Sequence, residues 1–280
     1  MKNEKNRKTL FLAVWLTLII ILIVGIVVLW PPGEKHETIR EVMKDGVLHE
    51  HNKMFFLGLE VNPGVVSAYM VTVILLTIAV ILRVFVIPKF QMVPGKFQSI
   101  LEKLVEFFAD MAKNNSPHKP GFVGAYIFTA GVYIFFSTLF ELLGIQGITT
   151  KGMSIALPAP ISDINAAIAL GVMSYGVILI AGIYYNGFRG ALGVLKDFSL
   201  PVSMSFRLFG ALLSGLLVTE LVYYYVGLSF VLPVVVGVLF TLLHAVIQTY
   251  VLATLVSIFY GEAVEPKPVK AKKKRKVEET

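Results

Sequence analysis

Long apolar runs dominate the sequence, and their lengths predict helices that cross a membrane. Such a helix needs about 20 predominantly apolar residues. Four separate runs approach or exceed this length, at residues 9–30, 61–82, 122–140 and 164–188. Residues 198–261 are almost continuously apolar, and two helices joined near residues 225–233 fit this stretch. The pattern therefore predicts an all-α integral membrane protein with about six transmembrane helices, of which the last two are long and tilted.

The predicted organisation has four parts. Residues 1–30 form a tail and an extra transmembrane helix, 31–60 an outer connecting segment, 61–261 the core, and 262–280 a basic cytoplasmic tail. Within the core, transmembrane helices are predicted at about residues 61–88, 120–144, 161–188, 198–225 and 229–261. An amphipathic helix is predicted at residues 96–113.

A signal peptide is the alternative interpretation of the first apolar run, because basic residues precede it, namely Lys2, Lys5, Arg7 and Lys8. The run is longer than the apolar part of a signal peptide, and no cleavage site of small residues follows it, so a retained span is favoured. With the N-terminus inside, six spans return the C-terminus to the same side. Both basic tails are then cytoplasmic, in agreement with the positive-inside rule.

Apolar residues between positions 97 and 112 recur with the i, i+3, i+4, i+7 spacing of one helix face. They are Phe97, Ile100, Leu101, Leu104, Val105, Phe108, Met111 and Ala112. Charged and polar residues occupy the opposite face, as on a surface helix of a soluble domain. The position between two spans and the lysines on the polar face instead favour an interfacial helix at the cytoplasmic leaflet.

Composition excludes several classes of function. Only 15% of the residues are charged, whereas soluble domains average about 25%. The chain has no cysteine and no GxxxxGK[ST] or HExxH motif, so we expect no thiol chemistry, nucleotide hydrolysis, catalytic metal or cofactor. The net charge of +7 and the run KAKKKRK could indicate nucleic-acid binding. Because the basic residues flank apolar runs, a solvated cytoplasmic tail beside the lipid bilayer is favoured, with no nucleic-acid partner.

Arg207 is a charged residue within an apolar stretch, since residues 198–206 and 208–219 are all apolar or small. An arginine at the centre of a membrane helix costs about 2.5–3.5 kcal/mol on insertion scales, so such residues are usually functional. The alternative is a side chain that reaches the headgroups from near a helix end. The length of apolar sequence on both sides argues against this alternative.

Small residues share the helix face of Arg207, at Ser203, Gly210 and Ser214. Small residues allow another helix to approach closely, either within this chain or from a moving partner. Glu220 is about 20 Å along the helix and on another face, so it cannot pair with Arg207. The other acidic residues of the spans lie near their outer ends. We therefore expect the carboxylate partner of Arg207 to come from another chain.

A polar stripe follows the last helix, where Thr241, His244 and Gln248 are spaced for one face. An isolated histidine in an apolar helix is usually an interhelical hydrogen-bonding group. Together with Glu220, the stripe instead suits an aqueous half-channel that reaches the middle of the membrane from outside. Asn165 and Glu141 either line its mouth or face the headgroups. The candidate ion-pathway residues are thus Glu220, His244, Gln248, Ser203, Asn165, Glu141 and Thr241.

At these residues the chain resembles subunit a of the F-type ATP synthase. The similar segments are PVSMSFRLFG at 201–210, IQTYVLATLVSIFY around Gln248, VPGKFQSILEKLVEFF at 93–108 and SDIN at 162–165. They cover most of residues 55–262. The resemblance implies a non-catalytic, ion-translocating stator subunit in a bacterial-type cell membrane. Its implied partners are the c-ring subunits, the peripheral-stalk b subunits and the remainder of the ATP synthase. Arg207 would be essential and face the ion-binding carboxylate of the ring, with Gln248 beside it.

The sequence departs from the family pattern near the motif. Ala211 replaces a common Asn, Leu216 stands where an acidic residue is frequent, and Thr241 stands where some members have His. Glu220 and His244 each lie one turn from these positions, so we expect them to take over the two roles jointly. The alternative functions are a self-contained cation-coupled transporter or channel and a purely structural assembly subunit.

Overall fold

The structure is a computed structural model that describes residues 14–17, 20, 53–56, 58–152, 154–224 and 232–266. The chain forms two compact units, Met1–Thr38 and Ile39–Thr280, and every candidate site residue belongs to the second. Most of the predicted first span and outer connecting segment, and nearly all of the basic tail, lie outside the described residues.

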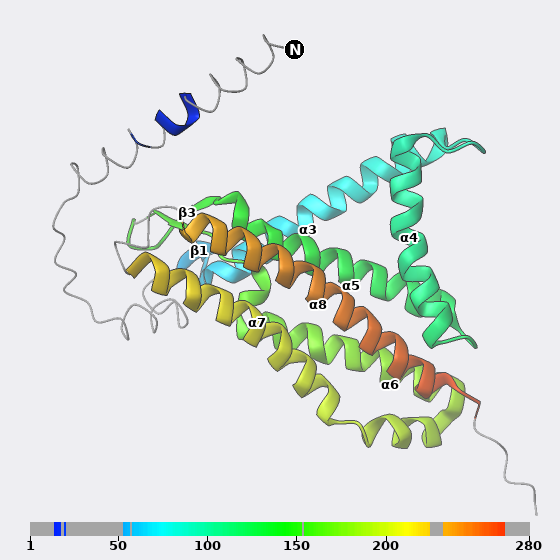
Figure 1. The fold of residues 1–280 in the computed structure, drawn as a ribbon. Helices are drawn as coiled ribbons and strands as arrows, with labels where there is room; N and C mark the ends of the chain where they lie inside the picture. Colours follow the sequence, from blue (N-terminus) through cyan, green and yellow to red (C-terminus); the bar gives the residue numbers. More distant parts are fainter. Residues whose placement is uncertain are drawn as a thin grey trace, which may run out of the picture. The chain divides into compact units, whose positions relative to one another are not determined.

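The described part of the second unit is mainly helical (Figure 1). Its helices are α3 (Pro63–Ile81), α4 (Lys96–Asn115), α5 (Pro120–Phe140), α6 (Ile164–Leu195), α7 (Ser199–Tyr224) and α8 (Leu232–Val264). A π-helical turn, η1 (Leu82–Val86), and a 3₁₀ turn, η2 (Ile87–Lys89), extend α3. Two further 3₁₀ turns are η3 (Glu141–Leu143) and η4 (Pro160–Ser162).

Four helical segments among the described residues are long and apolar enough to cross a membrane. They are Pro63–Lys89, Pro120–Leu143, Ile164–Leu195 and Gly237–Val264. The prediction of a mainly helical membrane protein is confirmed, whereas the number of six spans stays a prediction. Helix α7 begins and ends within one residue of its predicted bounds. Helix α8 begins and ends three residues later than predicted.

Capping residues account for where several helices begin and end. Asn62 accepts a hydrogen bond from the Gly64 amide at 3.4 Å, and Pro63 follows as the first residue of α3. The Asp163 carboxylate accepts from the Asn165 amide at 2.8 Å and so caps α6. These polar residues therefore stabilise helix starts at the same end of the bundle.

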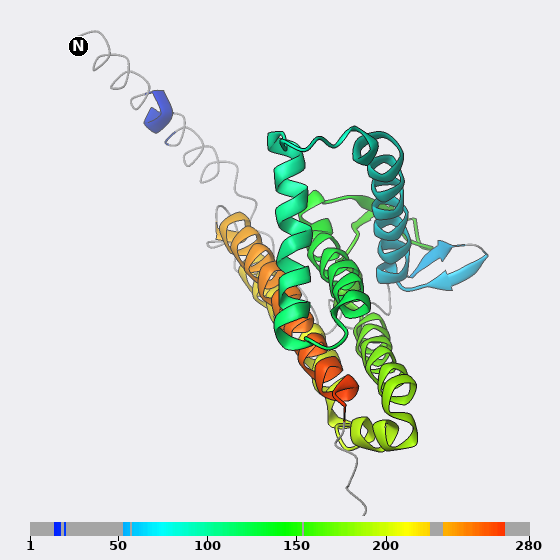
Figure 2. The ribbon, with the colours of Figure 1, turned by 90° about the vertical axis from the view of Figure 1, so that its right-hand side faces the viewer.

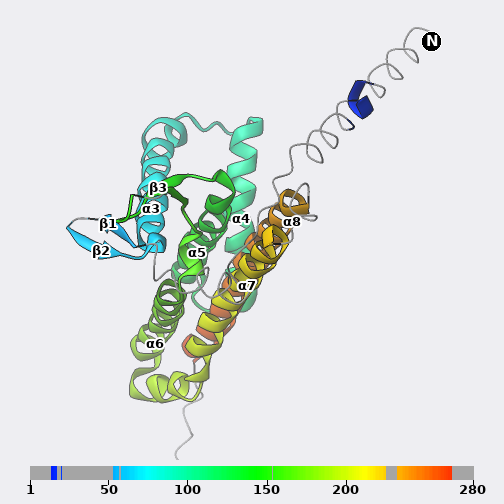
Figure 3. The ribbon, with the colours of Figure 1, turned by 90° about the vertical axis from the view of Figure 1, so that its left-hand side faces the viewer.

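Two short β-hairpins accompany the helices, one before α3 and one between α5 and α6, although only helices were predicted. Strands β1 (Met54–Phe56) and β2 (Leu59–Val61) pair antiparallel, as do β3 (Gln146–Ile148) and β4 (Ser154–Ala156). Figure 3 shows the first hairpin beside the start of α3. Strands of three residues are too short to show the alternating pattern by which a strand is recognised in a sequence.

Helix α8 occupies the centre of the packing, where it contacts α4, α5, α6 and α7. In Figures 1 and 2 it runs beside α5 and α7, and α4 crosses it near its C-terminal half. Its inward side chains are fully buried, among them Ala245, Ala253, Val256 and Tyr260. The two alanines among them allow the neighbouring helices to approach closely.

Helix α4 corresponds to the predicted amphipathic helix, but only part of its apolar face packs on the other helices. Phe108 and Ala112 are buried against α5 and α8. Phe97, Ile100 and Val105, in the first half of the face, are exposed by more than half. The location of this half at a membrane surface stays a prediction.

Helix α6 contains a sharp break at Gly187, close to the predicted end of this span at residue 188. Gly187 has φ 59° and ψ −148°, a backbone conformation that strongly favours glycine. The chain then turns back, so that Gly190 lies directly against the Gly182 carbonyl. The Tyr175 hydroxyl donates to the Val194 carbonyl at 3.2 Å and ties the returning segment to α6.

We expect Gly190→Ala to destabilise the protein, because its methyl group would overlap the Gly182 carbonyl. Overpacking of this kind costs about 1–3 kcal/mol. Gly176→Ala is the matched control in the same helix, since nothing lies within 4 Å of the added carbon. The control should be neutral or slightly stabilising. Thermal unfolding of the detergent-purified protein measures both, and equal midpoints would contradict the close approach of the returning segment.

Candidate functional site

Arg207 lies on a face of α7 that no other part of the described chain covers. Ser203, Gly210 and Ser214 lie on the same face and are likewise exposed. On the opposite side, Ser205 is only 6% exposed. The sequence prediction that small residues flank the arginine on one open helix face therefore agrees with the geometry.

The Arg207 side chain has no carboxylate partner among the side chains that the structure describes. Asp163 is a buried carboxylate, but it caps the start of α6 and packs against Gly64. The absence of an acidic partner matters because a guanidinium remains charged at any physiological pH. In a membrane, this charge needs a counter-charge or water.

Gln248 is the predicted site residue that the fold brings to Arg207. Its side-chain amide donates to the main-chain carbonyl of Arg207 at 3.3 Å. The Gln248 side chain is 5% exposed and therefore lies between α7 and α8. This hydrogen bond is made to the backbone of Arg207 and does not involve its guanidinium group.

His244 lies one turn before Gln248 and also faces α7. A carbon added at Gly215 would be 3.5 Å from Nδ1 of His244, so the ring rests against the α7 backbone. The ring centroids of His244 and Phe240 are 5.8 Å apart. Thr241 is partly buried one turn before His244. Gln248 and His244 thus form a polar seam at the contact of α7 and α8.

The remaining predicted pathway residues lie away from this seam or outside the description. Glu141 is partly buried in η3, at the end of α5, and η3 contacts α8. Asn165 is exposed at the start of α6. Glu220 belongs to α7, but its side chain lies outside the described part, so its joint role with His244 stays a prediction.

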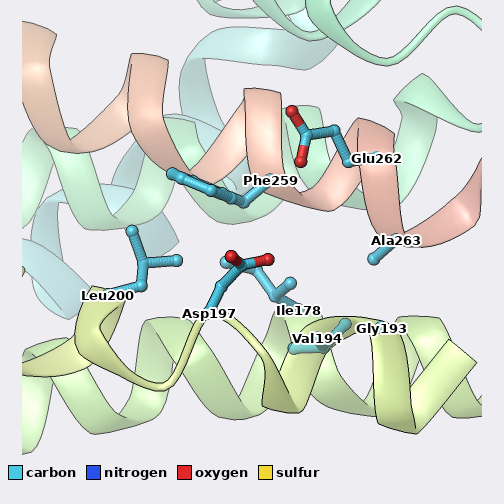
Figure 4. Close-up of a pocket in the computed structure, with 8 residues that line it drawn as sticks. All are labelled: Ile178, Gly193, Val194, Asp197, Leu200, Phe259, Glu262 and Ala263. Atoms are coloured by element: carbon cyan, nitrogen blue, oxygen red, sulfur yellow. The ribbon is translucent and has the colours of Figure 1, made fainter.

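A small polar pocket that the sequence reasoning missed lies near the C-terminal end of α8. Its volume is about 190 Å³, and its lining comprises Ile178, Gly193, Val194, Asp197, Leu200, Phe259, Glu262 and Ala263. Figure 4 shows the carboxylates of Asp197 and Glu262 on opposite sides of the pocket. The two residues are 65 positions apart, and only the return of the chain after Gly187 brings them together.

Asn186 holds this end of the bundle together. Its side-chain amide donates to the carbonyls of Ala263 at 2.8 Å and Glu265 at 3.0 Å, which are left without helical partners where α8 ends. Asn before Gly is usually taken as a turn signal, which explains why the sequence did not reveal this contact. No group of three or more metal-ligating side chains occurs among the described residues.

The fold and the seam together define a class: a helical membrane protein that presents, on an open helix face, an arginine with no acidic partner among the described side chains. Comparison with known families identifies the chain further. The chain belongs to the ATP synthase A chain family, whose model matches residues 67–261, well over half of its length. The family resemblance of the sequence motifs is therefore confirmed.

Membership of this family establishes the general role. The chain is a non-catalytic membrane subunit of the F-type ATP synthase, and it serves ion translocation as part of the stator. Family membership also implies that the chain assembles with the rest of that complex. A self-contained transporter is accordingly not favoured.

Proposed function

We propose that the open face of α7 receives the rotating c-ring and that Arg207 separates two offset half-channels. The observation that supports this proposal is the combination of an exposed guanidinium, small residues at Ser203, Gly210 and Ser214, and no acidic partner among the described side chains. A ring carboxylate would supply the missing counter-charge. The small residues would let the ring helices pass close to α7.

Electrostatics then gives the direction of each ion-transfer step. A guanidinium beside a carboxylate favours the ionised form, so a ring site that arrives opposite Arg207 must release its ion. The same fixed charge repels a hydrated cation that would otherwise leak between the half-channels. A lysine would serve less well, because it lacks the planar fork and loses its proton more readily when desolvated.

The outer half-channel would follow the polar residues of α7 and α8. Glu220 and His244 would relay the ion, Gln248 would lie at its inner end, and Thr241 would continue the stripe. Asn165 and Glu141 would line the mouth, a location that their positions at the ends of α6 and α5 support. Polar groups of this kind allow water to enter the membrane interior.

The second half-channel would open through the pocket that contains Asp197 and Glu262. This pocket lies about 20 Å from Gln248 along α8, counted at about 1.5 Å per residue. The two carboxylates that line it would attract cations. The basic residues Lys119, Arg189 and Lys196, at this end of α5 and α6, support a cytoplasmic location, in the cell membrane of a bacterial-type organism.

We expect Arg207→Ala and Arg207→Lys to abolish coupled ion transport, because the ring carboxylate would no longer be driven to release its ion. ATP-driven ion pumping in inverted membrane vesicles measures this effect. Arg83→Ala, in η1 away from the seam, is the matched control and should pump normally. Undiminished pumping by the Arg207 variants would refute the proposed role.

We expect the intact protein to copurify with small, two-helix subunits that carry a membrane-embedded acidic residue. After reconstitution alone, without these subunits, it should move no ions. A self-contained transporter would move ions alone, and an assembly subunit would tolerate loss of Arg207. Affinity purification from mild detergent, followed by flux measurements in liposomes, separates the three functions.

The double variant Glu220→Gln, His244→Ala should slow ion flux without dissociating the complex, because both groups would relay ions and neither would hold the subunits together. Flux is measured in vesicles and normalised to the amount of assembled complex. Leu239→Ala, an exposed apolar position on α8, serves as the control. Wild-type flux in the double variant would remove both residues from the pathway.

A further inference from the structure

Three helices meet tightly behind the polar seam, at Gly131 of α5. A carbon added to Gly131 would lie 2.7 Å and 2.8 Å from two ring carbons of Phe108 in α4. It would also lie 3.1 Å from the methyl group of Thr249 in α8. Ordinary carbon–carbon contacts are about 3.5–4.0 Å, so no residue larger than glycine fits here without movement.

The same contact contains a hydrogen bond between helices. The Thr249 hydroxyl donates to the Gly131 carbonyl at 3.2 Å. Phe108 is 3% exposed, and its ring packs edge-on against Phe128 of α5 at 5.6 Å between centroids. The ring therefore has little freedom to move away from Gly131.

Two further contacts hold the same side of α8. The Asn115 amide donates to the Ser257 hydroxyl at 2.8 Å, and the Thr254 hydroxyl contacts the Met111 sulfur at 3.6 Å. Both partners belong to α4. Helices α4 and α5 thus contact α8 along the two turns that follow Gln248.

Gln248 and Thr249 are neighbours in α8, so their side chains point about 100° apart around the helix axis. Thr249 points to α5, whereas Gln248 reaches the Arg207 carbonyl of α7. A rotation of α8 by about 20° would move an atom on its surface by roughly 2 Å, since the helix radius with side chains is about 5–6 Å. Such a displacement exceeds what the 3.3 Å hydrogen bond to Arg207 can absorb.

We propose that Gly131, together with Phe108 and Thr249, is a positioning residue for ion translocation. The contact sets the rotation of α8 and thereby holds Gln248 against the arginine-bearing helix. This inference rests on the proposed function of Arg207 and Gln248, and it adds a site on α5 that touches neither the ring nor the ion. A larger residue at position 131 displaces α8 and weakens coupling.

The first test is Gly131→Ala in the complete ATP synthase. We expect the number of ions pumped per ATP hydrolysed, normalised to assembled complex, to fall about tenfold, as misplacement by about 1 Å can cost a hundredfold in an active site. Thr249→Val, which removes the hydrogen bond but keeps the shape, should reduce the ratio by a smaller factor. Gly124→Ala is the matched control, because its added carbon is 3.4 Å from Ala112 of α4.

The rescue variant separates positioning from a general loss of packing. Leucine lacks the two outer ring carbons of Phe108 that would overlap the new methyl group. Gly131→Ala, Phe108→Leu should therefore regain at least half of the lost coupling, although it removes buried apolar surface. Failure of the rescue, with assembly intact, would overturn the positioning role.

A direct readout of helix position uses the absence of native cysteine. The pair Gly215→Cys, His244→Cys spans the contact of α7 and α8, where the added carbon and Nδ1 are 3.5 Å apart. Cross-linking by a short bifunctional thiol reagent should be efficient in this background, several-fold lower with Gly131→Ala, and restored with Phe108→Leu. Unchanged cross-linking would overturn the inference about α8. A further outcome is that Gly131→Ala reduces cross-linking in the two-cysteine background and yet leaves coupling normal in the chain that retains Gly215 and His244. That result would contradict the proposed function of the Arg207–Gln248 contact.

Discussion

A guanidinium inside a membrane must be neutralised, hydrated or brought to the headgroups, and this constraint organises the whole protein. The described side chains offer Arg207 no acid, while they bury other positions of its helix, such as Ser205 and Leu208. The charge is therefore directed outward from the bundle. In the proposed function, a carboxylate of the c-ring would offset the energetic cost of this charge.

The rest of the fold serves to hold that charge at one place. Helix α8 lies between the arginine-bearing helix and the pair formed by α4 and α5. Its polar groups face both ways, with Gln248 toward α7 and Thr249 toward α5. Individual hydrogen bonds between membrane helices are modest, typically about 0.6 kcal/mol. Their value here is orientation, because each of them specifies one rotation of the helix.

Much of this arrangement could be predicted from the sequence, for identifiable physical reasons. Apolar runs and their breakers located the helices, and the lone charge at Arg207 pointed to the candidate site, because both are local properties of the chain. The pocket of Asp197 and Glu262 could not be found in this way, since it depends on a reversal of the chain at Gly187. The contact at Gly131 was equally hidden, because a glycine in an apolar helix says nothing about which side chains approach it.

The reversal at Gly187 also determines where the arginine stands. As an unbroken helix, residues 164–195 would extend about 48 Å, whereas the hydrocarbon layer is about 30 Å thick. The break leaves residues 164–186 to span about 35 Å, and the returning segment starts α7 partway back along α6. Surface loops usually tolerate a change in length. Here the Tyr175–Val194 bond anchors the connection, so one inserted residue beyond it would advance α7 by about 1.5 Å and turn it by about 100°. The length of this connecting segment therefore determines the height and the rotation at which α7 presents Arg207.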